Sequence, residues 1–433
     1  MPPPPSLPAS TPVLVDPRPS LTVISGFWPT ATFAIARALL AADPSLLLVR
    51  HDMSAVRDGV IHRVVRTGAG VLEDEPVTLA SGGVPGALRD DVVPTLCRLA
   101  RTLPGRDILL LVPEVVEAQA VASACAQCTS DGAPIDDLLR VDSYVTVVAA
   151  EHLIDGLAST DDLAHLGIQT DEDDHRCLAE VITRQIEYAD TVVLWGQCPD
   201  GAFATARLSV LLQRIAPWAS HLTVGDHEVI DATELTRRLR HRHRHDAAVP
   251  DVLARGVEGF LLGVHEPVPD CGVVSTVFRT RRPFHPDRLN QVLQSAAADT
   301  LRSRGHLWLA TQPDTVIAWQ SAGGGVSMTT LGRWLVAEPD ARWEEVNAHR
   351  RLTAALDWDP YYGDRNTHLV FIGLHFDPAR LHRRLARCLL TDAELASGEE
   401  NWRALPDPFA GCFPTDPGAA GSANRPHRSH GLR

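Results

Sequence analysis

The chain has 433 residues, of which 45% are hydrophobic, and it carries a net charge of −14 with a sequence pI of about 5.7. This length supports a large buried core and predicts two domains, while the acidic balance argues against a surface that coats nucleic acid. The sequence contains no lysine, so its 40 basic residues other than histidine are all arginines. A phosphate-loop lysine, a kinase-type lysine and a lysine Schiff base are therefore excluded.

The two ends of the chain have compositions typical of disordered segments. Residues 1–20 are rich in proline and lack the basic and apolar regions of a signal peptide. Residues 413–433 contain few apolar side chains. No apolar run approaches the ~20 residues that span a bilayer. The eight cysteines are scattered, which favours a reduced, cytoplasmic protein.

The segment 21–40 predicts a buried strand, a glycine turn and the start of a helix. Nucleotide-binding α/β domains begin in this order, with helix N–H groups facing phosphate. A P-loop would have the pattern G-x-x-x-x-G-K-[ST] from Gly26 onward. The chain instead has Ala31, Thr32 and Phe33 where the second glycine, the lysine and the magnesium-binding hydroxyl belong. The candidate residues of this degenerate phosphate loop are Gly26, Thr30 and Thr32.

Apolar strands and amphipathic helices continue to alternate as far as residue 240. Strands are predicted at 46–49, 60–66, 77–79, 107–112, 143–148, 190–194 and 222–224, and helices at 87–103, 114–128, 172–188, 203–216 and 231–240. Residues 68–75 predict a turn-rich connection. This alternation predicts a mostly parallel sheet with helices on both faces, in a domain that spans 21–236.

A His/Arg-rich linker is predicted at 237–251. Its histidines alternate with arginines, and in an extended segment alternate side chains project to one side, so three imidazoles could meet one zinc or nickel ion. A solvated linker without metal is the more ordinary alternative. The candidate ligands are His241, His243 and His245. The neighbours His51 and Asp52 have no further ligand at metal spacing and predict a surface polar cluster.

The pattern changes beyond the linker, and residues 252–412 predict a small α+β domain with an antiparallel sheet. Its strands are predicted at 273–278, 306–311, 315–320, 325–330 and 368–372, and its helices at 286–302 and 378–389. Arginines cluster at the end of the first of these strands, and Trp and Tyr gather in the turn-rich segment 357–365. Exposed Trp and Tyr beside Arg are typical of protein-binding surfaces, and a structural loop with a solvated strand end is the alternative. The candidate partner-binding residues are Arg279, Arg281, Arg282, Trp358, Tyr361 and Tyr362.

Several sequence blocks of this second domain together resemble the C-terminal domain of CobW-type GTPase-like proteins. The blocks are RTRRPFHP from Arg279, GHLWLATQPD from Gly305, GRW from Gly332, LTDAEL from Leu390 and WRALPDPF from Trp402. The resemblance implies that the first domain is a P-loop-NTPase-like G domain. Residues 185–190 are similar to the segment that leads into the base-specificity strand of that family.

Where the resemblance places the functional residues of the family, this chain has other residues. The C-x-C-C metal motif falls at 83–86, which reads Gly-Val-Pro-Gly, and the guanine-binding N-K-x-D falls at 195–198, which reads Trp-Gly-Gln-Cys. The Walker-B-like aspartate falls at Ala149. The predicted fold is therefore a degenerate α/β G domain of P-loop-NTPase type, followed by a small α+β CobW C-terminal-like domain. No catalytic residue is assigned.

The domain order and the RRPFHP block are similar to actinobacterial members that recruit a ribosome hibernation factor when zinc is scarce. This resemblance implies a regulatory adaptor whose partner is a protein, either the hibernation factor or the ribosome, with no membrane and no sequence-specific nucleic acid. The first alternative is a GTP-dependent zinc metallochaperone of the CobW type, for which GTP and zinc would be the cofactors. A further alternative is an enzyme of another type that uses the vacated cleft.

Overall fold

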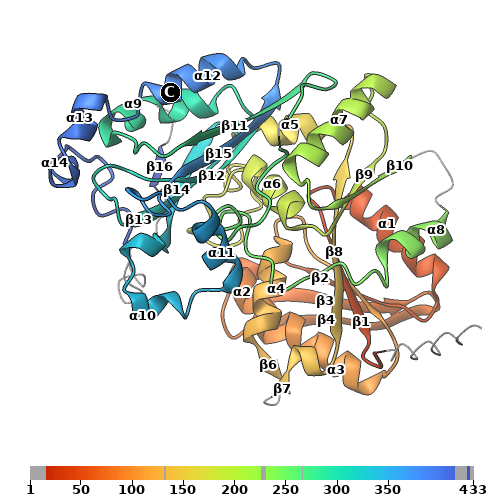
Figure 1. Ribbon diagram of the computed structural model, residues 1–433. Coiled ribbons are helices and arrows are strands. Elements are labelled where there is room, and N and C mark those ends of the chain that lie inside the picture. The colour runs from red at the N-terminus through yellow and green to blue at the C-terminus, as the bar shows by residue number, and fades with distance from the viewer. Residues whose placement is uncertain (1–15, 131–132, 226–230, 266, 415–426, 430–433) are drawn as a thin grey trace, which may run out of the picture.

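The computed structural model describes residues 16–130, 133–225, 231–265, 267–414 and 427–429, and these form two large sheets and one two-stranded ladder (Figure 1). The strands of the first are Ser20–Ser25 (β1), Leu47–Asp52 (β2), Val60–Thr67 (β3), Gly70–Thr78 (β4), Ile108–Leu111 (β5), Arg140–Ala149 (β8), Thr191–Trp195 (β9) and Ser220–Val224 (β10). Their order in the sheet is β10-β9-β8-β1-β5-β2-β3-β4. The strands from β10 to β2 in this order are parallel, and β3 and β4 extend the sheet in antiparallel fashion. A short ladder of Thr129–Ser130 (β6) and Ala133–Pro134 (β7) lies apart.

Helices cover both faces of this first sheet (Figure 1). They are Pro29–Ala42 (α1), Gly83–Ala87 (α2), Val93–Thr102 (α3), Ala118–Gln127 (α4), Leu153–Ala158 (α5), Leu178–Tyr188 (α6), Ala202–Ile215 (α7) and Ala232–Leu239 (α8). The apolar sides of α1 and α8 pack on one face, and those of α3, α4, α6 and α7 pack on the other. Because both faces are covered, all six residues of β1 are buried, as its apolar run predicted.

The second domain is built on an antiparallel sheet of order β11-β15-β12-β13-β14-β16. Its strands are Val273–Thr280 (β11), Arg302–Leu307 (β12), Thr315–Ala322 (β13), Gly325–Arg333 (β14), Thr367–Leu374 (β15) and His427–Ser429 (β16). Its helices are Pro286–Ala297 (α9), Asp340–Trp343 (α10), Ala348–Leu356 (α11), Pro378–Ala386 (α12), Asp392–Ala396 (α13) and Glu399–Arg403 (α14). One face of the sheet packs on α9 and α12. From the other face, Val273, Val370 and Ile372 join the apolar cluster around α7 of the first domain.

A buried ionic cluster joins the two domains. Glu187 on α6 accepts hydrogen bonds from Arg302 and Arg304 on β12, with 2.7 Å between Glu187 Oε2 and Arg302 Nη2. Exposure is 2% for Glu187, 1% for Arg302 and 0% for Arg304. Burial alone would raise the pKa of Glu187, but the two guanidinium groups hold it below its ordinary value. The three side chains therefore lie in the interface as ions.

The predicted fold class is confirmed, and several local predictions are wrong, among them the strand predicted at 306–311, which the structure places at Arg302–Leu307. The segment 68–75 is not a turn-rich connection, because only residues 68 and 69 form a turn. Residues 70–75 belong to β4, where Glu73 and Glu75 form ion pairs with Arg63 on β3. The predicted helix 286–302 ends at Ala297, and β12 begins at Arg302. The two arginines of β12, Arg302 and Arg304, face Glu187. In the predicted disordered ends, Ser20 already belongs to β1 and Phe413 is buried, while most of the remaining residues lie outside the described ranges. No helix of the described part is long and apolar enough to cross a bilayer.

Candidate functional site

A polar cleft of about 910 Å³ opens at the carboxyl ends of β1, β2 and β5. Ligands of open α/β sheets bind at this edge, which makes the cleft the first candidate site. Gly26 and Thr32, two of the three predicted phosphate-loop residues, line it, and the third, Thr30, is exposed on the first turn of α1. The guanidinium group of Arg50 lies 4.9 Å from the ring centre of Phe33, within the same lining.

The loop between β1 and α1 does not have the form of a phosphate-binding loop. It consists of residues 26–28 alone, because α1 begins at Pro29, which has no N–H group. The N–H groups of Ala31 and Thr32 donate to the carbonyl oxygen of Trp28 at 3.1 and 3.2 Å, and the Thr32 hydroxyl donates to the carbonyl oxygen of Pro29. Of the first four helical residues, only Thr30 keeps an N–H group that could face a phosphate.

Aromatic packing closes the same loop from the other side. Phe27 packs with Val115 and Leu163, and Trp28 lies against α5, where a Cβ on Gly156 would come within 3.1 Å of its ring. Gly26 itself has a φ of +151°, and a Cβ there would lie 2.2 Å from the carbonyl oxygen of Val147 on β8. The loop is therefore packed tightly against the sheet.

The charges that line the cleft also disfavour the binding of a nucleoside triphosphate. Its lining contains two arginines, Arg50 and Arg57, against five carboxylates, which are Asp52, Asp58, Glu114, Asp171 and Glu172. At the expected base site, Trp195 ends β9 half-buried in the core, and the N–H group of Cys198 donates to Thr205 Oγ1 at 3.0 Å. Ala149 is buried in the same core. The residues present do not fit a guanine nucleotide with its magnesium ion.

The cleft contains a buried histidine, where the sequence predicted a surface polar cluster. His51, at the end of β2, is 2% exposed, and its Nε2 lies 2.8 Å from Asp91 Oδ2. Arg63 donates to the other oxygen of Asp91. The carboxylate thus orients the imidazole toward the cleft, in the manner by which second groups position catalytic or ligating histidines. Asp91 comes from the helical segment 40 residues later, so local spacing could not reveal the pair.

The three histidines of the linker do not converge in this structure. His241, His243 and His245 face three different carboxylates, with N–O distances of 3.1 Å to Asp107, 3.7 Å to Asp142 and 3.6 Å to Asp190 respectively. The segment is not extended, because the φ angles of His241 and His243 are +56° and +49°. Nowhere in the described ranges are three or more His, Cys, Asp or Glu side chains placed to hold a metal ion. A shared zinc or nickel site would need a rearrangement of this segment.

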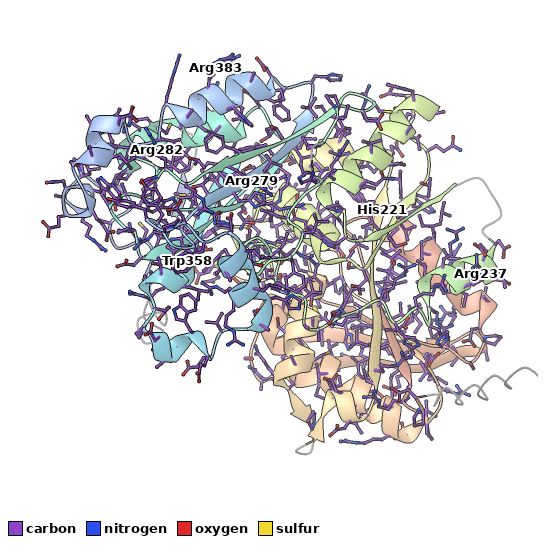
Figure 2. The ribbon with its side chains drawn as sticks, viewed as in Figure 1. His221, Arg237, Arg279, Arg282, Trp358 and Arg383 are labelled. Atoms are coloured by element: carbon purple, nitrogen blue, oxygen red, sulfur yellow. The ribbon has the colours of Figure 1, made fainter. Side chains whose placement is uncertain are left out.

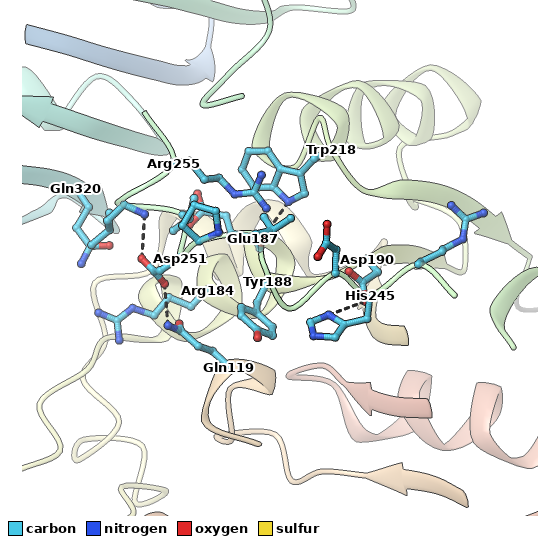
Figure 3. Close-up of a pocket in the computed structure, with 16 residues that line it drawn as sticks. Gln119, Arg184, Glu187, Tyr188, Asp190, Trp218, His245, Asp251, Arg255 and Gln320 are labelled. Atoms are coloured by element: carbon cyan, nitrogen blue, oxygen red, sulfur yellow. Dashed lines mark hydrogen bonds and ion pairs between the residues drawn. The ribbon is translucent and has the colours of Figure 1, made fainter. Parts of the chain in front are cut away.

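A second cavity, of about 450 Å³, lies between α6, the linker and the second domain (Figure 3). The guanidinium carbon of Arg255 lies 3.9 Å from the ring centre of Trp218, and Arg255 Nε has no hydrogen-bond partner in the described part of the chain. Burial, assisted by the nearby charge of Arg304, lowers the pKa of Arg255 to about 10. Asp190 and Asp251 on the opposite walls are bonded to the linker and to α4 (Figure 3). Since this lining mixes acids and bases, it does not favour one ligand charge.

The candidate partner-binding residues divide into two groups. Arg279 is exposed, and Arg281 and Arg282 form ion pairs with Asp357 and Asp392, at 2.7 and 2.6 Å. Figure 2 shows Arg279, Arg282 and Trp358 on the second domain.

The aromatic members of this set have different environments. Tyr361 is 75% exposed, whereas Tyr362 packs on the buried Trp308 and Trp358 packs on Trp343. Of the six predicted residues, the structure brings Arg279 and Arg281 together beside one groove.

Comparisons with known proteins match both domains. Residues 52–215 match the CobW/HypB/UreG nucleotide-binding domain, and residues 273–389 match the cobalamin synthesis protein cobW C-terminal domain. Over 366 residues the chain is 31% identical to a zinc chaperone, Rv0106, of Mycobacterium tuberculosis. This match covers 81% of this chain and 84% of that protein. Over 406 residues it is 25% identical to the zinc-regulated GTPase metalloprotein activator 1 of Dictyostelium discoideum, covering 90% of this chain and 83% of the other.

A solved structure also resembles this one. The Zn(II)-bound YjiA GTPase from E. coli has 15% identity and a TM-score of 0.35, and the match covers 86% of this chain and 99% of that chain. The match to the nucleotide-binding domain begins at residue 52 and so leaves out β1, the loop 26–28 and α1.

Proposed function

This chain belongs to the CobW family, and from that premise we propose that it acts in zinc handling through contact with a protein partner and without GTP turnover. The zinc-related part is supported by the names of the two relatives, zinc chaperone and zinc-regulated GTPase metalloprotein activator. The GTP-independent part is carried by one observation, the three-residue loop between β1 and α1. Zinc enters this proposal as cargo or signal, because no group of three ligands is in place among the described residues.

Two forms of this function differ in what zinc does. In the first, the protein passes zinc to a zinc-dependent partner, which agrees best with the names of the relatives. In the second, it recruits a ribosome hibernation factor when zinc is scarce, which rests on the resemblance in domain order and in the RRPFHP block. We favour the first form.

Calorimetric titration of the purified protein with GTP and magnesium tests the nucleotide part. We expect no heat of binding at 100 μM GTP, equivalent to a Kd weaker than ~1 mM. The variant Thr32→Lys restores the missing charge but not the loop length, so it should behave like the wild type. Binding tighter than ~10 μM together with phosphate release would overturn the proposal in favour of a GTP-dependent metallochaperone.

Competition with a chromophoric zinc chelator tests the cargo form. We expect one zinc ion to bind after the linker rearranges, because the three imidazoles face different carboxylates in this structure. The triple substitution of His241, His243 and His245 by Ala should then abolish binding. The control His165→Ala removes an exposed histidine elsewhere. Unchanged zinc binding in the triple variant would rule out the linker site.

Sedimentation with purified ribosomes separates the two forms. The cargo form predicts no co-sedimentation, with or without a zinc chelator. Co-sedimentation that appears only after zinc is removed would instead support the recruitment form.

A further inference from the structure

β11 forms one edge of the second sheet, and beyond Val273, which bridges to Asp270, its outer side is unpaired among the described residues. Thr276 to Arg279 make backbone hydrogen bonds only with β15, as far as the described residues go. The opposite edge of the sheet differs, because there β16 from the C-terminal end of the chain pairs with β14. The sheet thus accepts a short extended segment at one edge and leaves the other open. An open strand edge is a template for a further strand.

A cavity of about 830 Å³ runs along this open edge. It is lined by residues 276–279 on one side and by the segment 259–265 with Pro267 on the other. Successive residues of a strand point to opposite faces of the sheet. Thr276 faces α12, where its Oγ1 lies 2.9 Å from His382 Nε2, while Arg279 is paired in register with His368 on β15. Because the cavity touches four consecutive residues of β11, it reaches the edge of this strand and extends from there onto the face of the sheet, where His368 and Val370 of β15 also line it.

A second cavity, of about 540 Å³, continues the first toward α11. The two share Gly259, Phe260, Arg279 and His368. The second reaches Arg281 and Leu356, and Leu356 is 81% exposed. The two cavities together are named the β11 groove here. Its walls combine exposed apolar side chains with arginines, which is a composition typical of protein-binding surfaces.

The described lining of the β11 groove is positively charged, whereas the whole chain has a negative net charge. None of the 15 described residues that line the larger cavity is acidic, although the chain has a net charge of −14. Arg279 has no carboxylate partner among the described residues, and its Nη2 lies 3.2 Å from His368 Nε2. Asp357, the one acidic residue in the described lining of the smaller cavity, is already paired with Arg281. The groove is complementary to a segment that carries carboxylates.

We propose that the β11 groove binds an extended peptide of a partner protein, in which apolar and acidic residues alternate and which adds to β11 as a further strand. The main-chain groups of Thr276 to Arg279 would pair with the peptide, and its carboxylates would lie beside Arg279. This inference names the surface for the partner contact proposed above and rests on that function.

A peptide selection followed by an affinity measurement tests the proposal. A displayed library of random dodecapeptides is selected on the full-length protein, and the enriched peptides are synthesised with a fluorescein label for anisotropy titration. We expect enriched sequences with alternating apolar and acidic residues. N-methylation of alternate peptide nitrogens should weaken binding at least 10-fold, because it removes main-chain donors. Hydrogen exchange of the amides of 274–280 should slow in the complex.

Charge-reversal variants locate the binding site. Arg279→Glu should weaken binding at least 10-fold, and Arg279 is exposed, so the thermal unfolding curve should stay unchanged. The control Arg237→Glu makes the same charge change on α8, remote from the groove (Figure 2). The proposal is overturned if no acidic–apolar peptides are enriched, or if their affinity responds neither to N-methylation nor to Arg279→Glu.

The same variant separates this inference from the proposed function. If the zinc-dependent association with a protein partner persists in Arg279→Glu, the β11 groove is the wrong surface while the function stands. If the wild-type protein binds the selected peptides but zinc alters no association, the groove stands and the proposed function fails.

Discussion

His306 and His368 are buried beside each other on β12 and β15, with ring centres 6.0 Å apart. Burial lowers the pKa of His306 to about 4, and burial together with the charge of His306 lowers the pKa of His368 to about 3. His306 Nε2 lies 2.8 Å from Asn366 Oδ1, while its Nδ1 has no hydrogen-bond partner among the residues that the structure describes. Both imidazoles are therefore uncharged in the folded protein at neutral pH.

This burial predicts acid sensitivity of the second domain. The folded pKa of His306 lies below its ordinary value of 6.5, so the unfolded chain takes up a proton first as the pH falls. The stabilisation is complete above about pH 6.5 and is lost progressively toward pH 4. In this window the unfolding free energy of the wild type decreases as the pH is lowered. We expect this decrease to be smaller in His306→Gln, by up to ~1.4 kcal/mol per pH unit.

Urea unfolding at pH 7.5, 6 and 5 measures this effect. The control His165→Gln changes an exposed histidine and should leave the pH dependence as in the wild type. An equal pH dependence of the unfolding free energy in His306→Gln and the wild type would show that His306 is protonated inside the folded domain.

At the scale of the element, the loop 26–28 determines how α1 meets the sheet. Gly26 is needed both for its φ of +151° and for the close approach of its Cα to the carbonyl oxygen of Val147. Its aromatic neighbours then fill the space that a phosphate-binding loop leaves open. The helix, the strand and the glycine are those of a nucleotide-binding domain, and the loop between them is a packing contact.

Substitution of Gly26 separates the cost of a strained φ angle from the cost of the contact between a Cβ and the carbonyl oxygen of Val147. Gly26→Ala should destabilise the protein by more than ~2 kcal/mol, because both a strained φ and a Cβ only 2.2 Å from an oxygen must be relieved. Gly70→Ala is the matched control, since Gly70 has a similar φ of +156° with nothing within 4 Å of a Cβ. Urea midpoints measure both. Equal losses would mean that the contact with Val147 relaxes at no cost.

At the scale of the whole molecule, Glu187, Arg302 and Arg304 join the two domains through a buried contact. Replacing one member of a buried ionic cluster leaves the other charges unpaired, which costs far more than a surface pair contributes. The apolar contacts of α7 with β11 and β15 surround the cluster. We therefore expect the domains to unfold together.

Glu187→Gln tests this interface. We expect a loss of about 3–5 kcal/mol in unfolding free energy, because two buried guanidinium groups lose their counter-ion. The control Glu234→Gln breaks the exposed pairs with Arg237 and Arg238 and should leave the urea midpoint unchanged. Tryptophan fluorescence follows the transition. A wild-type-like midpoint for Glu187→Gln would show that the triad does not hold the domains together.

The sequence alone determined those features whose cause is local. The apolar runs of β1 and β5, the alternation of strands and helices, the absence of lysine and the family blocks of the second domain were all legible without coordinates. Each depends on residues next to one another in the chain, because strand burial and helix amphipathicity follow from short periodic patterns.

Only the tertiary structure decided which distant side chains meet. His51 pairs with Asp91 across 40 residues, and Glu187 pairs with Arg302 across 115. The linker histidines alternate in sequence, yet they diverge in space because the backbone between them turns. The open edge of β11 exists because β15, far along the chain, takes the other side of the strand. Such pairings depend on long-range packing, which no local pattern encodes.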